Sequence, residues 1–118
     1  MAEELDPNNL IDMDSLMMLK ELLGEKFVEL IETYLRDSAA RIEKLKVALE
    51  AGDIETAKHE VHGLKGSSRN IGINSLADTC DILEKQTHAG TVTNEEQQLA
   101  AIEQNFAAVA VKLKTFIE

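Results

Sequence analysis

The chain has 118 residues, a net charge of −10, a single cysteine and very few aromatic side chains. This length predicts one domain, spanning residues 1–118, whose core needs no disulfide or structural metal. An acidic chain with so few aromatic residues argues against nucleic-acid binding. No stretch has the length of a membrane span or the pattern of a signal peptide. We therefore expect a soluble, cytoplasmic protein in which Cys80 is a small buried hydrophobic residue.

The pattern of apolar residues is helical nearly throughout, and Pro7 near the start is the only proline. After a loose N-terminal segment at residues 1–9, a short helix is predicted from about Asp12 to Leu23, ending at Gly24. A long helix is predicted from about Glu25 to Glu50, because its apolar residues follow one face.

Three further helices are predicted from capping signals. Asp53, Asn74 and Thr93 are expected to be the N-caps, since short polar side chains accept the first free backbone N–H groups of a helix. The expected ends are about Asn70, with Gly72 as the stop, and Gly90. Short connections make successive long helices antiparallel. The predicted fold is all-α: an antiparallel up-down four-helix bundle with a short additional N-terminal helix.

The third predicted helix carries a histidine on its outer face. Placed at about 100° per residue, His62 points roughly 130° away from the centre of the apolar face. We therefore expect His62 to be exposed to solvent. The residues expected on the core face are Ile54, Ala57, Val61, Leu64 and Ser68.

Cations surround this histidine in the sequence. Lys58, Lys65 and Arg69 fall on the same side of the helix as His62, whereas Glu60 does not. A neutral imidazole is a nucleophile, and nearby cations stabilise the oxygens of a phosphoryl group. The simpler interpretation is a solvated polar face, but the shared side favours a phosphoryl-accepting function.

Two glycines interrupt the same helix, although each costs about 1 kcal/mol relative to alanine in a helix interior. Gly66 lies one turn beyond His62, where the missing side chain gives another protein room to approach the imidazole. The sequence offers no comparable reason for Gly63.

The segment from His62 onward resembles the signature of histidine-containing phosphotransfer (HPt) domains. The similarity extends from about Leu10 to the C-terminus, and its departures are Val61 in place of a common Ala and Ala39–Ala40 in place of a common proline. The residues that carry it are His62-Gly-Leu-Lys65-Gly66-Ser67-Ser68, then Gly72, Leu76, Cys80 and Leu83-Glu84, with Ala48–Asp53 before them.

The resemblance implies roles for several residues. His62 would be the phosphorylated residue, Lys65 would lie beside the phosphohistidine, Gly66 would give the partner clearance, and Ser67 and Ser68 would support helix packing. Lys58 is expected to support the phosphate on the basis of its position alone. The residues expected to contribute to partner docking are Arg69, His59 and Ser67.

The resemblance also implies the reaction and the partners. A phosphoryl group would pass from the aspartate of one receiver domain to the histidine and on to a second receiver aspartate. The partners would be receiver domains of response regulators or of a hybrid sensor histidine kinase. Mg²⁺ would be supplied by the receiver, so no metal site or other cofactor is expected on this chain. The chain lacks a glycine-rich phosphate loop and kinase signatures, and it is expected to be a monomer and not a kinase.

Three alternatives remain at the level of sequence. One is a metal site built from His59, His62, Cys80 and His88, although His-x-x-His alone is a weak signal. Another is the dimerising helical hairpin of a sensor kinase, in which an acidic residue follows the phosphorylated histidine, as Glu60 follows His59. The third is a helical interaction module without phosphotransfer.

Overall fold

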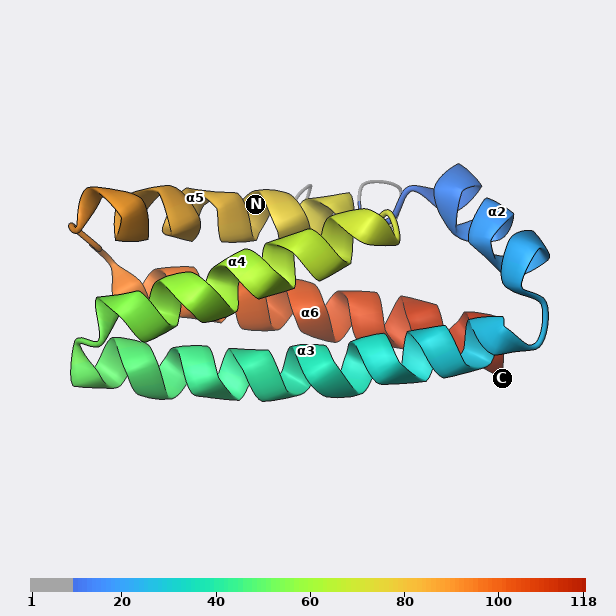
Figure 1. Ribbon diagram of the computed structural model, residues 1–118, viewed down its shortest axis with the longest axis horizontal. Coiled ribbons are helices and arrows are strands. Elements are labelled where there is room, and N and C mark those ends of the chain that lie inside the picture. The colour runs from blue at the N-terminus through green and yellow to red at the C-terminus, as the bar shows by residue number, and fades with distance from the viewer. Residues whose placement is uncertain (1–9) are drawn as a thin grey trace.

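The computed structural model describes residues 10–118, so the predicted loose segment at residues 1–9 lies outside the described part. Within it the secondary structure is entirely helical, and Figure 1 shows the arrangement. The helices are α2 (Met13–Leu23), α3 (Lys26–Ala51), α4 (Ile54–Asn70), α5 (Asn74–Ala89) and α6 (Glu95–Ile117).

The four long helices form a closed bundle. Helix α4 packs against α3 on one side and α5 on the other, while α6 contacts both α3 and α5. The short α2 lies at one end of the bundle and contacts α3 (Figure 1). The molecule measures 42 × 28 × 20 Å. The predicted all-α, up-down four-helix bundle with a short additional helix is confirmed.

Most of the predicted helix boundaries are confirmed. Side-chain caps fix the starts of two helices, α2 and α4. The Asp12 carboxylate accepts the backbone N–H of Ser15 at 3.2 Å, and the Asp53 carboxylate accepts that of Thr56 at 3.1 Å. Caps of this kind contribute about 1 kcal/mol each. At the other end of α3, Gly52 takes the left-handed conformation, with φ +71°, that ends many helices.

The predicted caps Asn74 and Thr93 are wrong. Asn74 is the first residue of α5 and buried Ile73 precedes it, because the Ile73 N–H bonds to the Ser68 carbonyl at 2.8 Å and turns the chain directly into α5. Thr93 donates its backbone N–H to Gln86 Oε1 at 2.9 Å, so α6 begins only after Asn94.

The core lies on the inner faces of the four long helices. Ala57, Val61 and Leu64 of α4 are fully buried, as predicted, while Ile54 is only half-buried. Cys80 of α5 is also fully buried, which confirms the expectation for this residue, and burial raises the pKa of its thiol to about 12. No helix among residues 10–118 is both long enough and apolar enough to cross a membrane.

Candidate functional site

His62 lies in the middle of α4 on the side that faces α5, and its side chain is 69% exposed. The predicted exposure is therefore confirmed. Nδ1 of the ring lies 2.5 Å from Oε2 of Glu84 on α5, and within residues 10–118 this is the ring's one hydrogen bond. This contact links two helices and holds an exposed imidazole in a defined orientation.

Glu84 is a buried carboxylate, with its side chain only 6% exposed. Burial raises its pKa, but the Lys65 ammonium 2.6 Å from Oε1 and the His62 ring more than offset this, so the pKa falls below its usual value. The group is therefore ionised at neutral pH and can only accept hydrogen bonds. Nδ1 of His62 must carry the proton, which leaves the lone pair of the neutral ring on Nε2.

Two of the three predicted cations are paired with carboxylates of α5. Lys65 contacts both Glu84 and Asp81, the latter at 3.3 Å, and its side chain is only 23% exposed. The hydrogen bond to Glu84 raises the pKa of Lys65. Arg69 lies 3.1 Å from Asp78.

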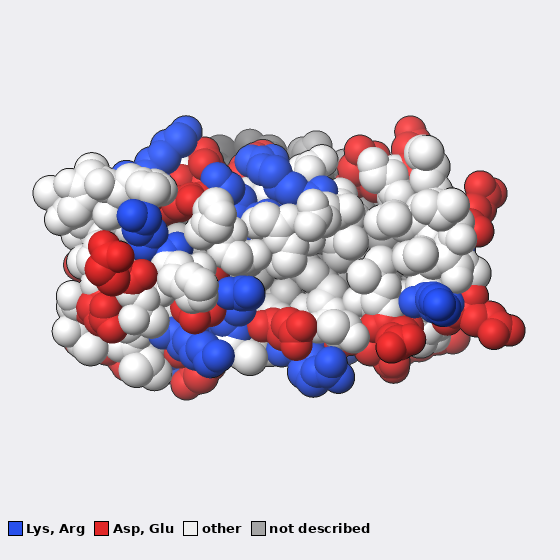
Figure 2. All heavy atoms as spheres, in the orientation of Figure 1, with Lys and Arg blue, Asp and Glu red and all other residues white. Residues whose placement is uncertain are grey.

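The expected cluster of cations beside His62 is therefore largely neutralised. A single helix wheel cannot show which charges the neighbouring helix supplies, and here α5 supplies carboxylates. Figure 2 shows Lys and Arg interspersed with Asp and Glu on this face of the molecule. Lys58 differs from the other two cations, because among residues 10–118 it makes no ion pair.

A depression of about 320 Å³ opens beside His62 between α4 and α5. His88 of α5 reaches the same Glu84 oxygen as His62, with its Nε2 3.6 Å away. That separation is too long for a hydrogen bond. The depression is lined by Glu55, Lys58, His59 and His62 of α4 and by Glu84 and His88 of α5.

The two glycines of α4 occupy different surroundings. Among residues 10–118, a Cβ atom at Gly66 would have no neighbour within 4 Å apart from its chain neighbours and its own helix backbone, so the space above the turn after His62 is open. A Cβ atom at Gly63 would overlap the guanidinium of Arg41, which crosses from α3 to bind Glu60 at 3.1 Å. Gly63 therefore makes room for an ion pair between two helices, a reason that the sequence did not reveal.

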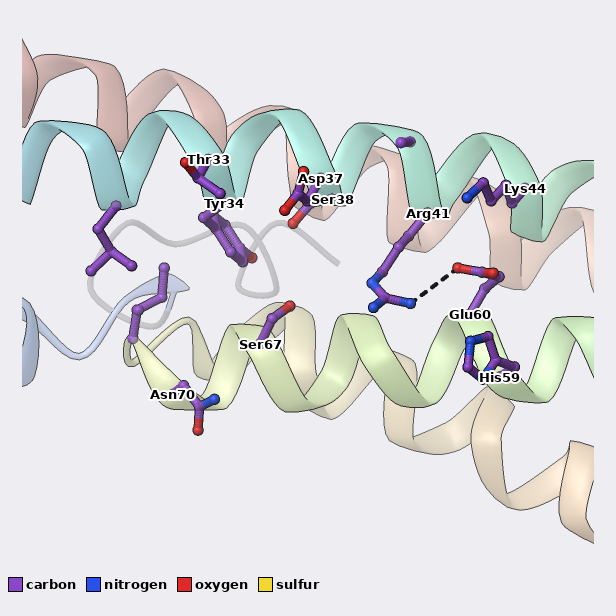
Figure 3. A pocket seen from close by; sticks show the side chains of 13 residues that line it. Thr33, Tyr34, Asp37, Ser38, Arg41, Lys44, His59, Glu60, Ser67 and Asn70 are labelled. Atoms are coloured by element: carbon purple, nitrogen blue, oxygen red, sulfur yellow. Dashed lines mark hydrogen bonds and ion pairs between the residues drawn. The ribbon is translucent and has the colours of Figure 1, made fainter.

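The other side of α4 faces a groove of about 490 Å³ against α3, shown in Figure 3. Ser67 lines this groove and donates its hydroxyl to the Leu64 carbonyl at 3.2 Å. Ser68 is buried below it and hydrogen-bonds to the hydroxyl of Tyr34 at 2.8 Å. His59 borders both this groove and the depression beside His62.

The predicted docking residues therefore do not form one continuous surface. Ser67 lies on the α3 side of α4, Arg69 is paired toward α5, and His59 lies between the two sides. Their role in docking stays a prediction.

The structure does not assemble the alternative metal site. Cys80 is fully buried, whereas His62 is largely exposed. In the described part of the chain, no three His, Cys, Asp or Glu side chains are placed to hold a metal ion together. Glu60, the acidic residue of the sensor-kinase alternative, is bound to Arg41.

Comparison with known proteins agrees with this geometry. The sequence profile of the Hpt domain matches residues 29–112. Histidine-containing phosphotransfer protein B (HptB) of Pseudomonas aeruginosa is 30% identical, with a TM-score of 0.88 over 92% of this chain and 94% of that chain. A rice protein described as a histidine-containing phosphotransfer protein shares the fold, with a TM-score of 0.81 at 22% identity over 97% of this chain and 85% of its own. No curated protein sequence gives a significant match.

Proposed function

Because this chain belongs to the Hpt domain family and is a phosphorelay intermediate, we propose that His62 is the residue that carries the phosphoryl group. The observation that supports this most strongly is the asymmetry of the ring. Nδ1 is held by the buried Glu84 carboxylate, while the side chain as a whole remains 69% exposed.

The proposed reaction uses Nε2 of His62 as the nucleophile. Nε2 attacks the phosphorus of a receiver-domain aspartyl phosphate, the N–P bond forms, the P–O bond breaks, and the aspartate leaves as a carboxylate. The ring, which keeps the proton on Nδ1, then carries a positive charge. Glu84 lies against that proton and stabilises the charge, in the way that a buried carboxylate supports an imidazolium in enzyme active sites. Attack by a second receiver aspartate reverses the same steps.

Lys65 acts in this proposal through Glu84. Its ammonium lies 2.6 Å from Glu84 Oε1 and 3.3 Å from Asp81, so it fixes the carboxylate that orients the histidine. We therefore assign Lys65 a positioning role. Gly66 gives the receiver its approach, since apart from its chain neighbours and the backbone of its own helix no atom of residues 10–118 lies within 4 Å of where its side chain would begin.

The partner in this proposal is a receiver domain of a response regulator or a hybrid sensor kinase. The receiver's acidic pocket supplies Mg²⁺, and this chain contributes neither a metal nor ATP binding. Exposed Met17, Met18 and Leu22 of α2 offer apolar surface for docking. We propose that the chain works as a monomeric, cytoplasmic carrier without kinase activity of its own.

The test is transfer from a phosphorylated receiver domain in the presence of Mg²⁺. We expect an acid-labile, base-stable label on the wild type and on His59→Gln, and none on His62→Gln. Label that persists on His62→Gln would move the acceptor to His59 or His88. No label on any of these proteins, with several receivers tried, would favour the interaction module without phosphotransfer.

A further inference from the structure

The surroundings of His62 differ between the two ends of α4 and α5. Because these helices are antiparallel, the residue one turn before His62 on α4 and the residue one turn after Glu84 on α5 lie toward the same end of the bundle. These residues are Lys58 and His88, and both line the open depression. The opposite direction leads to Lys65 and Asp81, which are bound to each other at 3.3 Å.

The phosphoryl group needs positive neighbours that the resting structure does not commit elsewhere. It adds about two negative charges at neutral pH, on a chain whose net charge is already −10. The ammonium of Lys65 is engaged by two carboxylates, Glu84 at 2.6 Å and Asp81 at 3.3 Å. Turning it toward the phosphoryl group would break both of these ion pairs.

Lys58 meets this requirement, and His88 meets it when its ring is protonated. Lys58 makes no ion pair among residues 10–118. The His88 ring stands 3.6 Å from Glu84, close enough for an ion pair when the ring is protonated but beyond hydrogen-bond distance. Helical side chains lean toward the N-terminal turn, so His62 leans toward the turn that carries Lys58. The phosphoryl group on Nε2 is therefore expected to enter the depression that these residues line.

We propose that Lys58 of α4 and His88 of α5 form the binding site for the phosphoryl oxygens of phosphorylated His62. Lys65 and Glu84 orient the ring, and Lys58 and His88 receive the group that the ring carries. This inference rests on the proposed function, because it takes His62 as the acceptor.

The experiment labels the protein without a receiver. Potassium phosphoramidate transfers its phosphoryl group to the imidazole with release of ammonia, and the ³¹P resonance of the product is followed as a function of pH. We expect Lys58→Ala and His88→Gln each to raise the pH midpoint of the phosphoryl resonance by about 0.3–0.5 units, the size of an exposed charge pair.

Lys85→Ala is the matched control. Lys85 is an exposed lysine of α5 that pairs with Asp81 at 2.9 Å and does not line the depression. Its removal is expected to leave the midpoint unchanged, and His88→Lys should restore the wild-type midpoint or lower it. The ¹H–¹⁵N signal of His62 Nδ1–H in unphosphorylated His88→Gln should match the wild type, which shows that the contact with Glu84 persists.

The outcomes separate this inference from the proposed function. A phosphoryl resonance that requires His62 but keeps its midpoint in both Lys58→Ala and His88→Gln overturns the phosphoryl site and leaves His62 as the acceptor. An equal shift in Lys85→Ala also overturns it, because the effect is then one of general charge. A resonance that persists in His62→Gln, or no labelling of the wild type, removes His62 as the acceptor and this inference with it.

Discussion

Two buried glutamates form ion pairs on opposite sides of α4, and the two pairs have different functions. Glu60 points from α4 to α3 and binds Arg41 at 3.1 Å, whereas Glu84 points from α5 to α4 and binds His62 and Lys65. Both residues are buried, with 7% and 5% of their surface exposed. The difference lies in the partner. Arginine keeps its charge permanently, so the Glu60 pair can only join helices, while the exposed imidazole at Glu84 keeps one nitrogen free for chemistry.

The largest expected effect separates the two carboxylates by function. Glu84→Gln removes the charge that supports the imidazolium, so we expect the rate of phosphoryl transfer from a receiver to fall at least about tenfold, or about 1.4 kcal/mol. Glu60→Gln should leave that rate unchanged, because Glu60 lies on the other side of α4. Equal rate losses in the two variants would show that the distinction between them is mistaken.

The two glycines of α4 give the second contrast. Gly66→Ala adds a methyl group in open space and should stabilise the helix by up to about 1 kcal/mol. Gly63→Ala makes the Arg41 guanidinium shift and weakens its ion pair with Glu60, so we expect a net loss of up to about 1 kcal/mol. Urea denaturation measures both changes in the free energy of unfolding.

A double variant shows whether Arg41 is the cause. In an Arg41→Ala background, Gly63→Ala no longer displaces a guanidinium, and it should become neutral or stabilising by up to about 1 kcal/mol. If Gly63→Ala remains as harmful in that background, the ion pair does not explain the glycine.

A smaller effect is expected at the buried hydroxyl pair on the α3 side. Tyr34→Phe removes the partner of the Ser68 hydroxyl, and burial raises the pKa of Tyr34 to about 12, so the tyrosine is neutral throughout the working range. We expect a loss of about 1 kcal/mol in thermal or urea unfolding. Phosphoryl transfer should not change, and a variant impaired in transfer but not in stability would link this side of α4 to the chemistry.

The smallest expected effect is the pH dependence of stability on the Glu84 side. The pKa values of Glu84 and Asp81 are lowered, so their contribution is present above their unfolded values and is lost as pH falls through the folded ones. The pKa of Lys65 is raised, so its contribution is complete below its ordinary value and is lost only as pH rises through the raised value.

The corresponding experiment compares the wild type with Lys65→Met in urea denaturation at several pH values. The stability difference should be constant between about pH 6 and 9 and shrink below about pH 4, as the carboxylates are protonated. A difference that grows in acid would mean that Lys65 is not held by carboxylates.

The sequence correctly predicted those features that depend on a single helix. The ends of α2 and α3, the cap at Asp53 and the exposure of His62 follow from local patterns. The features that the sequence did not predict depend on contacts between two neighbouring helices. These are the contact of His62 with Glu84, the neutralisation of Lys65 and Arg69 by α5, and the passage of Arg41 over Gly63. Glu84 belonged to the recognised signature, but a helix wheel cannot place it against His62.

The two wrongly predicted N-caps, before α5 and before α6, failed for one shared reason. Asn74 and Thr93 are good capping residues by type, yet the turn before α5 is set by the Ile73 contact with Ser68, and the start of α6 by the contact of Thr93 with Gln86. In both places a hydrogen bond to a residue five or seven positions earlier in the chain overrode the local capping preference.

The most direct test of the central claim is to identify the phosphorylated atom by ¹H–¹⁵N and ³¹P correlation in protein labelled by a phosphorylated receiver. The account predicts phosphorus bonded to Nε2 of His62, with the Nδ1 proton retained toward Glu84. Phosphorus on Nδ1 of His62, or on His59 or His88, would contradict it.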